Sequence, residues 1–373
     1  MRIAQLANFV GPASGGMKTA VNALGAGYVA AGAQRLLVVP GARDARTTTE
    51  AGDIVQLRAP RVGGGYRLIL EPWRVIDALE EFGPTSVEVS DKSTLVPVSR
   101  WARRNGVGSL LFSHERLDAM LTLRTGWVAG VGPSVSALNR FLVRRFDGVV
   151  VTSAFAEREF GEEAAAAGTP VHRVPLGVDL ETFRPPSSRA PGEGLLRLVH
   201  VGRLSREKSP HLAVATAVEL HRRGVPLRMD VYGQGPHRDE LEGLAEDAPV
   251  VFHGHVADRR RLSRLIGRAD VALSVCPGET FGLAVLEALA SGTPVVTADA
   301  GGARELVDEQ SGAWAEPTPA ALADAVLEVA HRPPASRRAA ARRRAEQFPW
   351  QRTVDAMLEL HRRSTYDAAE LAG

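Results

Sequence analysis

Short apolar runs alternate with longer amphipathic stretches along most of the chain. In the first half these runs lie at 36–39, 86–89, 109–112 and 149–151. Uninterrupted apolar runs of this length predict buried strands of a mostly parallel sheet, and the stretches between them predict helices on both faces. The same rhythm begins again at 196–201, 229–232, 250–252 and 271–273. The pattern therefore predicts an α/β chain with two similar sheets.

The break between the two halves is rich in proline, serine, arginine and glycine, from Pro175 to Gly194. At 373 residues the chain exceeds the roughly 250 to 300 residues at which single cores usually split. We therefore expect a first domain at 1–178, a linker at 179–194 and a second domain at 195–348. The segment 349–373 has the spacing of an amphipathic helix.

Composition narrows the range of functions. Lys and Arg number 45 against 43 Asp and Glu, so the net charge of +2 does not call for a nucleic-acid partner. The arginine-rich stretch 336–345 is interpreted as a solvated helix. The single cysteine, Cys276, cannot form an internal disulfide, and we interpret it as a small buried residue. Neither a signal core nor a run of about 18 apolar residues occurs, which favours the cytoplasm and at most a peripheral membrane contact.

Several loops at predicted strand ends carry residues that suit a phosphorylated ligand. Gly15 and Gly16 precede a helical run and offer close backbone approach at a helix start, although a bare tight turn explains them equally well. Their spacing fits neither G-x-G-x-x-G nor a Walker A loop. Arg203 and Lys208 follow a predicted strand, at an end of the sheet where ligands bind in α/β proteins. Two cations at this place suit a diphosphate. The alternative is that both are exposed surface charges. His114 also follows a strand, and a hydrogen-bonded core histidine is its alternative.

The strongest signal is the pair Glu279 and Glu287 around the start of a predicted helix. Amides of Phe281, Gly282 and Leu283 at this helix start can hold phosphate oxygens, and Glu287 can accept hydrogen bonds from sugar hydroxyls. Two solvated helix glutamates are the alternative.

In these motifs the chain resembles glycosyltransferase family 4, whose members have the GT-B fold of two Rossmann-like domains facing each other across a cleft. The resemblance covers essentially the full chain. It rests on the Gly15–Gly16 loop, on 202–204 with Lys208, and on E-x7-E from Glu279 to Glu287. Further matches lie at 174–179, 233–236, 252–256 and 290–296.

The resemblance implies a role for each of these positions in turn. It makes the first domain the acceptor-binding domain and the second the nucleotide-sugar-binding domain, with the last helix crossing back to the first. Arg203 and Lys208 would bind the diphosphate, Glu279 would contact the transferred sugar, and Glu287 would hold the donor ribose. His114 would lie near the sugar and the acceptor.

The nucleobase would meet the turn at 254–256, including Val256, and Asp258 could accept from the guanine edge. The reaction implied is hexosyl transfer with retention, without metal or cofactor, aided by domain closure. The departing phosphate oxygen can itself take the acceptor proton.

The amino-acid sequence at 16–20 and 113–118 is most similar to that of actinobacterial GDP-mannose-dependent α-mannosyltransferases of glycolipid and phosphatidylinositol mannoside synthesis. UDP-dependent glucosyl or sulfoquinovosyl transferases share much of this pattern. A nucleotide-sugar epimerase, a phosphorylase and a non-catalytic sugar-nucleotide sensor are more distant alternatives. A lipid acceptor would bring the first domain to the inner face of the plasma membrane, where 61–70 and 138–145 combine basic and apolar residues. Core-facing helix residues with solvated arginines explain 138–145 about as well.

Overall fold

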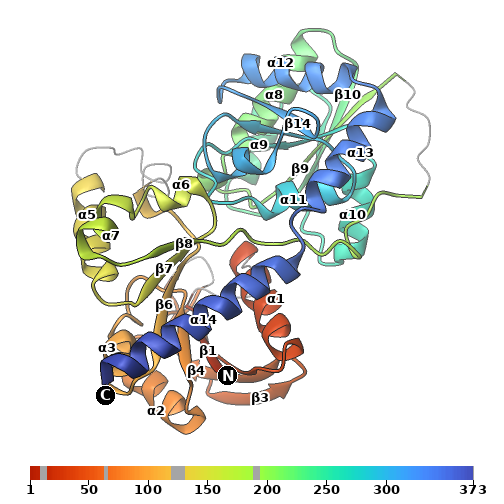
Figure 1. Cartoon of the computed structure of the whole chain (residues 1–373). Helices are drawn as coiled ribbons and strands as arrows, with labels where there is room; N and C mark the ends of the chain where they lie inside the picture. Colours follow the sequence, from red (N-terminus) through yellow and green to blue (C-terminus); the bar gives the residue numbers. More distant parts are fainter. Residues whose placement is uncertain (9–14, 63–65, 119–130, 188–193, 373) are drawn as a thin grey trace. The chain divides into compact units, whose positions relative to one another are not determined.

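The computed structural model describes residues 1–8, 15–62, 66–118, 131–187 and 194–372, and the chain divides into two compact units (Figure 1). The described part of the first unit runs from Met1 to Leu176 and resumes at Trp350, and the second unit runs from Gly177 to Pro349. Each unit is built on its own mostly parallel sheet, which confirms the predicted α/β class. Of the predicted linker, residues 188–193 lie outside the described part of the chain.

The first unit contains an eight-stranded sheet in the order β3-β4-β2-β1-β5-β6-β7-β8, parallel except for β3. Its strands are β1 (Arg2–Leu6), β2 (Gln34–Gly41), β3 (Ala45–Thr49), β4 (Gly52–Arg58), β5 (Ser86–Val89), β6 (Gly108–Ser113), β7 (Gly148–Val151) and β8 (Val171–Arg173). The four predicted runs correspond to β2, β5, β6 and β7. Every residue of β3 is exposed, so no apolar run marks this edge strand in the sequence.

The helices of the first unit that the structure describes are α1 (Gly16–Ala30), α2 (Pro72–Phe82), α3 (Pro97–Arg104), α5 (Val131–Val143), α6 (Ala154–Glu157), α7 (Gly161–Ala167) and α14 (Trp350–Ala372). Both α2 and α3 begin with proline, whose missing N–H costs nothing in a first turn. Helix α14 packs against α1, β5 and β6 (Figure 1), so the end of the chain completes the first unit.

A buried polar network joins α14 to the sheet. The carboxylate of Glu88 in β5 is fully buried and accepts hydrogen bonds from the Tyr28 hydroxyl at 2.8 Å and from Gln5 Nε2 at 3.2 Å. His361 of α14 lies with Nε2 3.4 Å from the same carboxylate, and its Nδ1 is 2.8 Å from Ser86 Oγ. Burial alone would raise the pKa of Glu88, but His361, Tyr28 and Gln5 together hold that pKa below its ordinary value.

Acid is therefore expected to weaken the first unit through Glu88. Because the folded-state pKa lies below the ordinary value of 4.5, the ionised carboxylate stabilises the fold above that pH, and the stabilisation is lost as the pH falls further. At pH 7 we expect Glu88→Gln to lower the free energy of unfolding by about 1 to 3 kcal/mol, and at low pH the difference from wild type should shrink. Urea unfolding across the pH range measures this. The exposed Glu50→Gln is the control, and a constant gap would contradict the role of Glu88.

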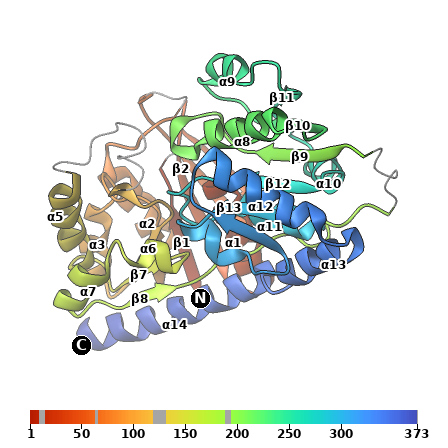
Figure 2. The ribbon, with the colours of Figure 1, turned by 90° about the horizontal axis from the view of Figure 1, so that it is seen from above.

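The second unit contains a six-stranded parallel sheet in the order β11-β10-β9-β12-β13-β14. Its strands are β9 (Leu196–Val201), β10 (Leu227–Tyr232), β11 (Val250–Gly254), β12 (Val271–Ser274), β13 (Val295–Ala298) and β14 (Gly312–Ala315). Its α-helices that the structure describes are α8 (Pro210–Arg222), α9 (Arg238–Leu244), α10 (Arg259–Gly267), α11 (Leu283–Ala290), α12 (Pro319–His331) and α13 (Pro334–Ala345). Helix α8 packs against α12, and α11 packs against α10 and α13 (Figure 2). The strand order reverses between β9 and β12, which is where ligands bind in open parallel sheets.

The arginines of α13 correct one interpretation of the sequence. Arg337 is only 5% exposed and donates to Asp270 at 2.9 Å. Arg338 donates to the carbonyl of Ala269 at 3.0 Å, and Arg342 donates to the carbonyl of Ala290 at 3.0 Å. The interpretation of 336–345 as a solvated helix is therefore wrong. These guanidinium groups satisfy carbonyl groups that the second unit partly buries.

Candidate active site

The glutamate loop of the second unit connects β12 to α11. Within it, the carboxylate of Glu279 accepts two hydrogen bonds from Lys208 Nζ, at 2.9 and 2.8 Å. Lys208 follows β9, and the two residues are 71 positions apart in the chain. They meet because β9 and β12 are parallel neighbours, whose carboxyl ends lie at the same edge of the sheet. Lysine and glutamate thus occupy the point where the strand order reverses.

Arg203 lies on the same loop as Lys208. Its Nη1 is 3.5 Å from Glu207 Oε1, and Glu207 also accepts from Ser205 Oγ at 2.8 Å. The side chains of Arg203 and Lys208 are 34% and 38% exposed, whereas those of Glu207 and Glu279 are 15% and 16% exposed. Carboxylates therefore hold both cations from the protein side, and part of each cation remains open to an anion from solvent.

We call the loop after β9 that carries Arg203 and Lys208 the cation loop. A glycine-rich loop after β10 fixes its backbone. Leu204 N donates to the carbonyl of Gln234 at 3.0 Å, and Gly202 N donates to that of Tyr232 at 3.1 Å. A Cβ atom added to Gly235 would lie 2.2 Å from the carbonyl oxygen of Leu204. Only glycine therefore allows the two loops to approach this closely.

We expect Gly235→Ala to displace the cation loop and to weaken binding of a nucleoside diphosphate by roughly ten- to a hundredfold, since a hydrogen bond to a charged group contributes about 1.5 to 3 kcal/mol. Calorimetric titration measures the affinity. The matched control is Gly243→Ala in α9, where an added Cβ meets no heavy atom within 4 Å. Equal affinity of the two variants would show that the contact with Leu204 does not position the cations.

The start of α11 offers unpaired amides. The backbone N–H groups of Phe281, Gly282 and Leu283 donate to no acceptor within the part of the chain that the structure describes. Gly282 has a φ of 100°, a left-handed value that favours glycine, and an added Cβ would lie 3.2 Å from Ala303 Cβ. This backbone places positively polarised N–H groups at the helix start in the loop that carries Glu279, which suits a phosphate.

Glu287 lies within α11 and is only 8% exposed. Burial raises its pKa, against the attraction of Arg259, whose Nη2 donates to Glu287 Oε1 at 2.7 Å. Arg259 could not be singled out from the sequence, because it belongs to a run of three arginines that begins α10 and carries no spacing signal. The guanidinium of Arg259 also lies 4.9 Å from the ring centre of Phe183. Arg259 thus orients the carboxylate predicted to hold the ribose.

The predicted base-binding residues lie after β11. Val256 is half-buried, and Asp258 is exposed. The Asp258 carboxylate caps α10 by accepting from Arg261 N at 3.1 Å, and this backbone hydrogen bond lowers the pKa of Asp258. This capping role was not predicted from the sequence. The residue remains an ionised acceptor on the exposed surface.

His114 lies in the first unit, directly after β6. Its Nε2 is 2.9 Å from Ser90 Oγ, and its ring stacks on Phe112 with centroids 4.2 Å apart. Burial lowers the pKa of His114 to about 4, so the imidazole is neutral at pH 7. Gly15 and Gly16 stand at the start of α1, and residues 9–14 of the same predicted loop lie outside the described part of the chain.

An ion-paired cluster holds the loop that follows His114. Lys92 donates to the Glu159 carboxylate at 3.0 Å and to the carbonyl of Glu115 at 2.7 Å. Glu159 also accepts from Leu117 N at 3.0 Å. The neighbouring Arg116 donates twice to Asp118, at 2.7 and 2.8 Å. These contacts fix the backbone beside the imidazole.

Cys276 lies close to Glu279 without the properties of a nucleophile. It is 3% exposed, and its thiol is 3.2 Å from the carbonyl of Glu207, to which it donates. Burial raises the pKa of Cys276 to about 11, with a further contribution from Glu279. The thiol is therefore protonated at neutral pH, which confirms its interpretation as a small buried residue.

The candidate site of the second unit therefore contains two cations, three backbone amides at a helix start and two carboxylates. This set suits an anionic diphosphate flanked by groups that carry hydroxyls. Among the described residues no cluster of three or more His, Cys, Asp or Glu side chains could hold a metal ion.

Comparison with known proteins gives the family. Residues 196–332 match the family model described as glycosyl transferases group 1, and residues 15–177 match the glycosyl transferase 4-like domain. The chain is 42% identical to a Mycobacterium tuberculosis GDP-mannose-dependent alpha-(1-6)-phosphatidylinositol dimannoside mannosyltransferase, over 96% of this chain and 95% of that protein. It is 31% identical to an Arabidopsis thaliana sulfoquinovosyl transferase over 65% of this chain and 48% of that protein.

Solved structures give the fold. Sucrose-phosphate synthase from Thermosynechococcus elongatus superposes with a TM-score of 0.81 at 22% identity, covering 97% of this chain and 98% of that chain. Trehalose-6-phosphate synthase superposes with a TM-score of 0.71 at 14% identity, covering 97% and 99%. The chain therefore belongs to the group 1 glycosyltransferases with a glycosyltransferase 4-like first half, and it has the GT-B fold expected from its sequence.

Proposed function

We propose that this chain is a retaining α-mannosyltransferase that transfers mannose from GDP-mannose to a phosphatidylinositol mannoside glycolipid. The proposal is supported by the mycobacterial relative, which is similar over nearly the whole of both chains. One structural observation gives the proposed function its strongest support. Lys208 and Glu279 are joined by two hydrogen bonds at the reversal of strand order, and Glu279 lies in the loop that presents the unpaired amides at the start of α11.

In the proposed reaction the leaving group is the GDP diphosphate, which gains negative charge as the sugar bond breaks. Arg203, Lys208 and the amides from Phe281 to Leu283 stabilise that charge in the second unit. The diphosphate competes with Glu279 for Lys208, which frees the glutamate for the hydroxyls of mannose. A departing phosphate oxygen takes the acceptor proton on the same face of the sugar, so retention requires no carboxylate base.

The remaining residues orient the donor and the acceptor. Glu287, held by Arg259, accepts from the ribose hydroxyls. The backbone at Val256 contacts the base, and Asp258 accepts from the guanine N–H groups that uracil lacks. In the first unit Gly15 and Gly16 approach the donor through their backbone, and the neutral His114 hydrogen-bonds the sugar or the acceptor. We propose that none of these steps uses a metal or a cofactor.

A lipid acceptor requires contact with a membrane, which we propose is the cytoplasmic face of the plasma membrane. On the first unit Val62, Leu70 and Trp73 are 46%, 53% and 57% exposed; Arg61 and Arg67 lie in the loop with Val62 and Leu70, and Trp73 lies in the first turn of the α2 helix that follows it. Exposed apolar and aromatic side chains beside arginines are typical of peripheral membrane contacts. None of the helices in the described ranges has the length and apolar character to cross a bilayer.

The test is incubation of the purified chain with phosphatidylinositol mannosides and either radiolabelled GDP-mannose or radiolabelled UDP-glucose. The proposal expects labelled lipid from GDP-mannose and background label from UDP-glucose, with an α linkage in the product by NMR. Labelled lipid from UDP-glucose alone would overturn the donor, and a β linkage would overturn retention. Transfer to a soluble acceptor with unlabelled lipid would overturn the acceptor class.

A further inference from the structure

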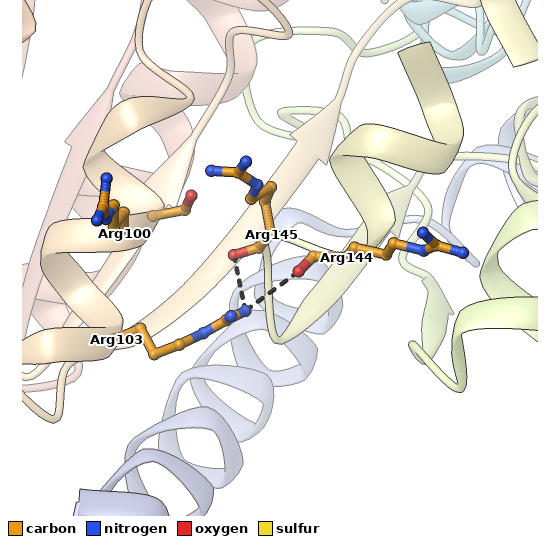
Figure 3. Close-up of a pocket in the computed structure, with 5 residues that line it drawn as sticks. Arg100, Arg103, Arg144 and Arg145 are labelled. Carbon is orange, nitrogen blue, oxygen red and sulfur yellow. Dashed lines mark hydrogen bonds between the residues drawn. The ribbon is translucent and has the colours of Figure 1, made fainter. Parts of the chain in front are cut away.

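A pocket of about 270 Å³ lies on the first unit, between α3 and the end of α5 (Figure 3). Its lining residues are Ser99, Arg100, Arg103, Arg144 and Arg145, and we call it the arginine pocket. It contains none of the residues predicted to bind the donor, while Arg144 and Arg145 belong to the segment 138–145 that was predicted from sequence to contact a membrane.

Hydrogen bonds and stacking hold two of the guanidinium groups in place. Arg103 Nη2 donates to the carbonyls of Arg144 at 3.2 Å and Arg145 at 3.4 Å, which ties α3 to the chain after α5. The guanidinium of Arg145 lies 4.5 Å from the ring centre of Phe141. Figure 3 shows the Arg144 side chain pointing away from those of Arg100, Arg103 and Arg145, so Arg144 contributes its backbone. Three guanidinium groups, on Arg100, Arg103 and Arg145, therefore supply the charge of the pocket.

The charge of these arginines is not balanced locally. Some arginines elsewhere on the surface are paired with carboxylates, as Arg223 is with Asp324 and Arg238 is with Glu242. Among the side chains that the structure describes, no carboxylate lies within 4.0 Å of the guanidinium groups of the arginine pocket. Gathering like charges costs electrostatic energy that a bound anion recovers. Guanidinium forks match the oxygens of a phosphate in geometry as well as in charge.

The place of the pocket in the fold separates it from the predicted acceptor site. Strands β5, β6 and β7 are parallel, and the ends of α3 and α5 lead into the amino ends of β6 and β7. His114 follows the carboxyl end of β6. The arginine pocket therefore lies toward the opposite edge of the sheet from His114.

We propose that the arginine pocket is a second anion site, which binds a phosphate group independently of the transfer reaction. That group can come from free phosphate or from an anionic lipid headgroup, since the recognition chemistry is the same. Phe141, 44% exposed beside Arg145, places an apolar side chain where a lipid would need one.

The test compares the full-length wild type with the double variant Arg100→Gln/Arg145→Gln. The matched control is Arg362→Gln/Arg363→Gln on α14, which removes the same charge from residues 54% and 68% exposed in the same unit. Excess GDP is present in both arms of the experiment, so that the predicted diphosphate site is filled and does not bind the probe. One arm titrates inorganic phosphate by calorimetry, and the other sediments the protein with phosphatidylcholine vesicles with or without phosphatidylglycerol.

We expect the pocket variant to lose about tenfold or more in affinity for at least one probe, because two charge-assisted contacts are removed. The control variant should bind like wild type, and an unchanged circular dichroism spectrum and melting temperature show that the first unit of the pocket variant is folded. Loss in the phosphate arm identifies a site open to free phosphate, and loss with phosphatidylglycerol vesicles alone identifies a headgroup site. The proposal is overturned if wild type binds neither probe, if the pocket variant binds as wild type does, or if both variants lose affinity equally.

Discussion

Lys208→Ala is expected to lower kcat/KM for sugar transfer by roughly a hundred- to a thousandfold, the range seen when one group that stabilises developing negative charge is removed. Lys208 Nζ is held by both oxygens of Glu279 at the reversal of strand order, and its side chain remains 38% exposed. Its loss removes a cation from the diphosphate and leaves Glu279 without its partner. Steady-state kinetics with the donor in excess separates the effect on kcat from the effect on donor binding.

The adjacent Arg206→Ala is the matched control, since Arg206 is an exposed cation in the same turn and has no assigned role. It should transfer at close to the wild-type rate. Lys208→Arg keeps the charge with a different shape and should recover part of the activity. If Lys208→Ala is folded and as active as wild type, Lys208 does not stabilise the leaving group.

Asp270→Ala is expected to lower the free energy of unfolding of the second unit by about 3 to 5 kcal/mol, because it leaves the charge of a buried arginine uncompensated. Arg337 is 5% exposed and donates to Asp270 at 2.9 Å, and Asp270 also accepts from Arg197 N at 3.0 Å. Chemical denaturation followed by circular dichroism measures the loss.

The control for this variant is Asp324→Ala, which breaks the ion pair with Arg223 at a carboxylate 71% exposed. Exposed pairs contribute little, so this variant should unfold close to wild type. Equal destabilisation by the two substitutions would mean that burial of the Arg337 pair does not matter.

The strands could be predicted from sequence because their apolar runs are local signals. The run at 86–89 coincides with β5, and the run at 196–201 coincides with β9. Strand β3 could not be predicted in this way, since all of its residues are exposed. The network of Glu88 and His361 was also missed, because it joins polar residues whose proximity depends on how α14 packs.

For the candidate site, the sequence indicated residue types and loops but few contacts. The motifs that contain Arg203, Lys208 and Glu279 are each local, and only the strand order brings Lys208 to Glu279. Arg259 was missed because its partner Glu287 lies on another helix. The arginines of α13 were misjudged for the same reason, since the spacing of an arginine does not show whether its carbonyl acceptors are buried.

The most direct test of the account is calorimetric titration of the wild type with GDP and with UDP. If the second unit binds a GDP-sugar as proposed, GDP should bind about tenfold more tightly or better, because the guanine edge offers Asp258 hydrogen bonds that uracil lacks. Binding of UDP as tight as that of GDP, or tighter, would contradict the proposed donor while leaving the fold and the family unchanged.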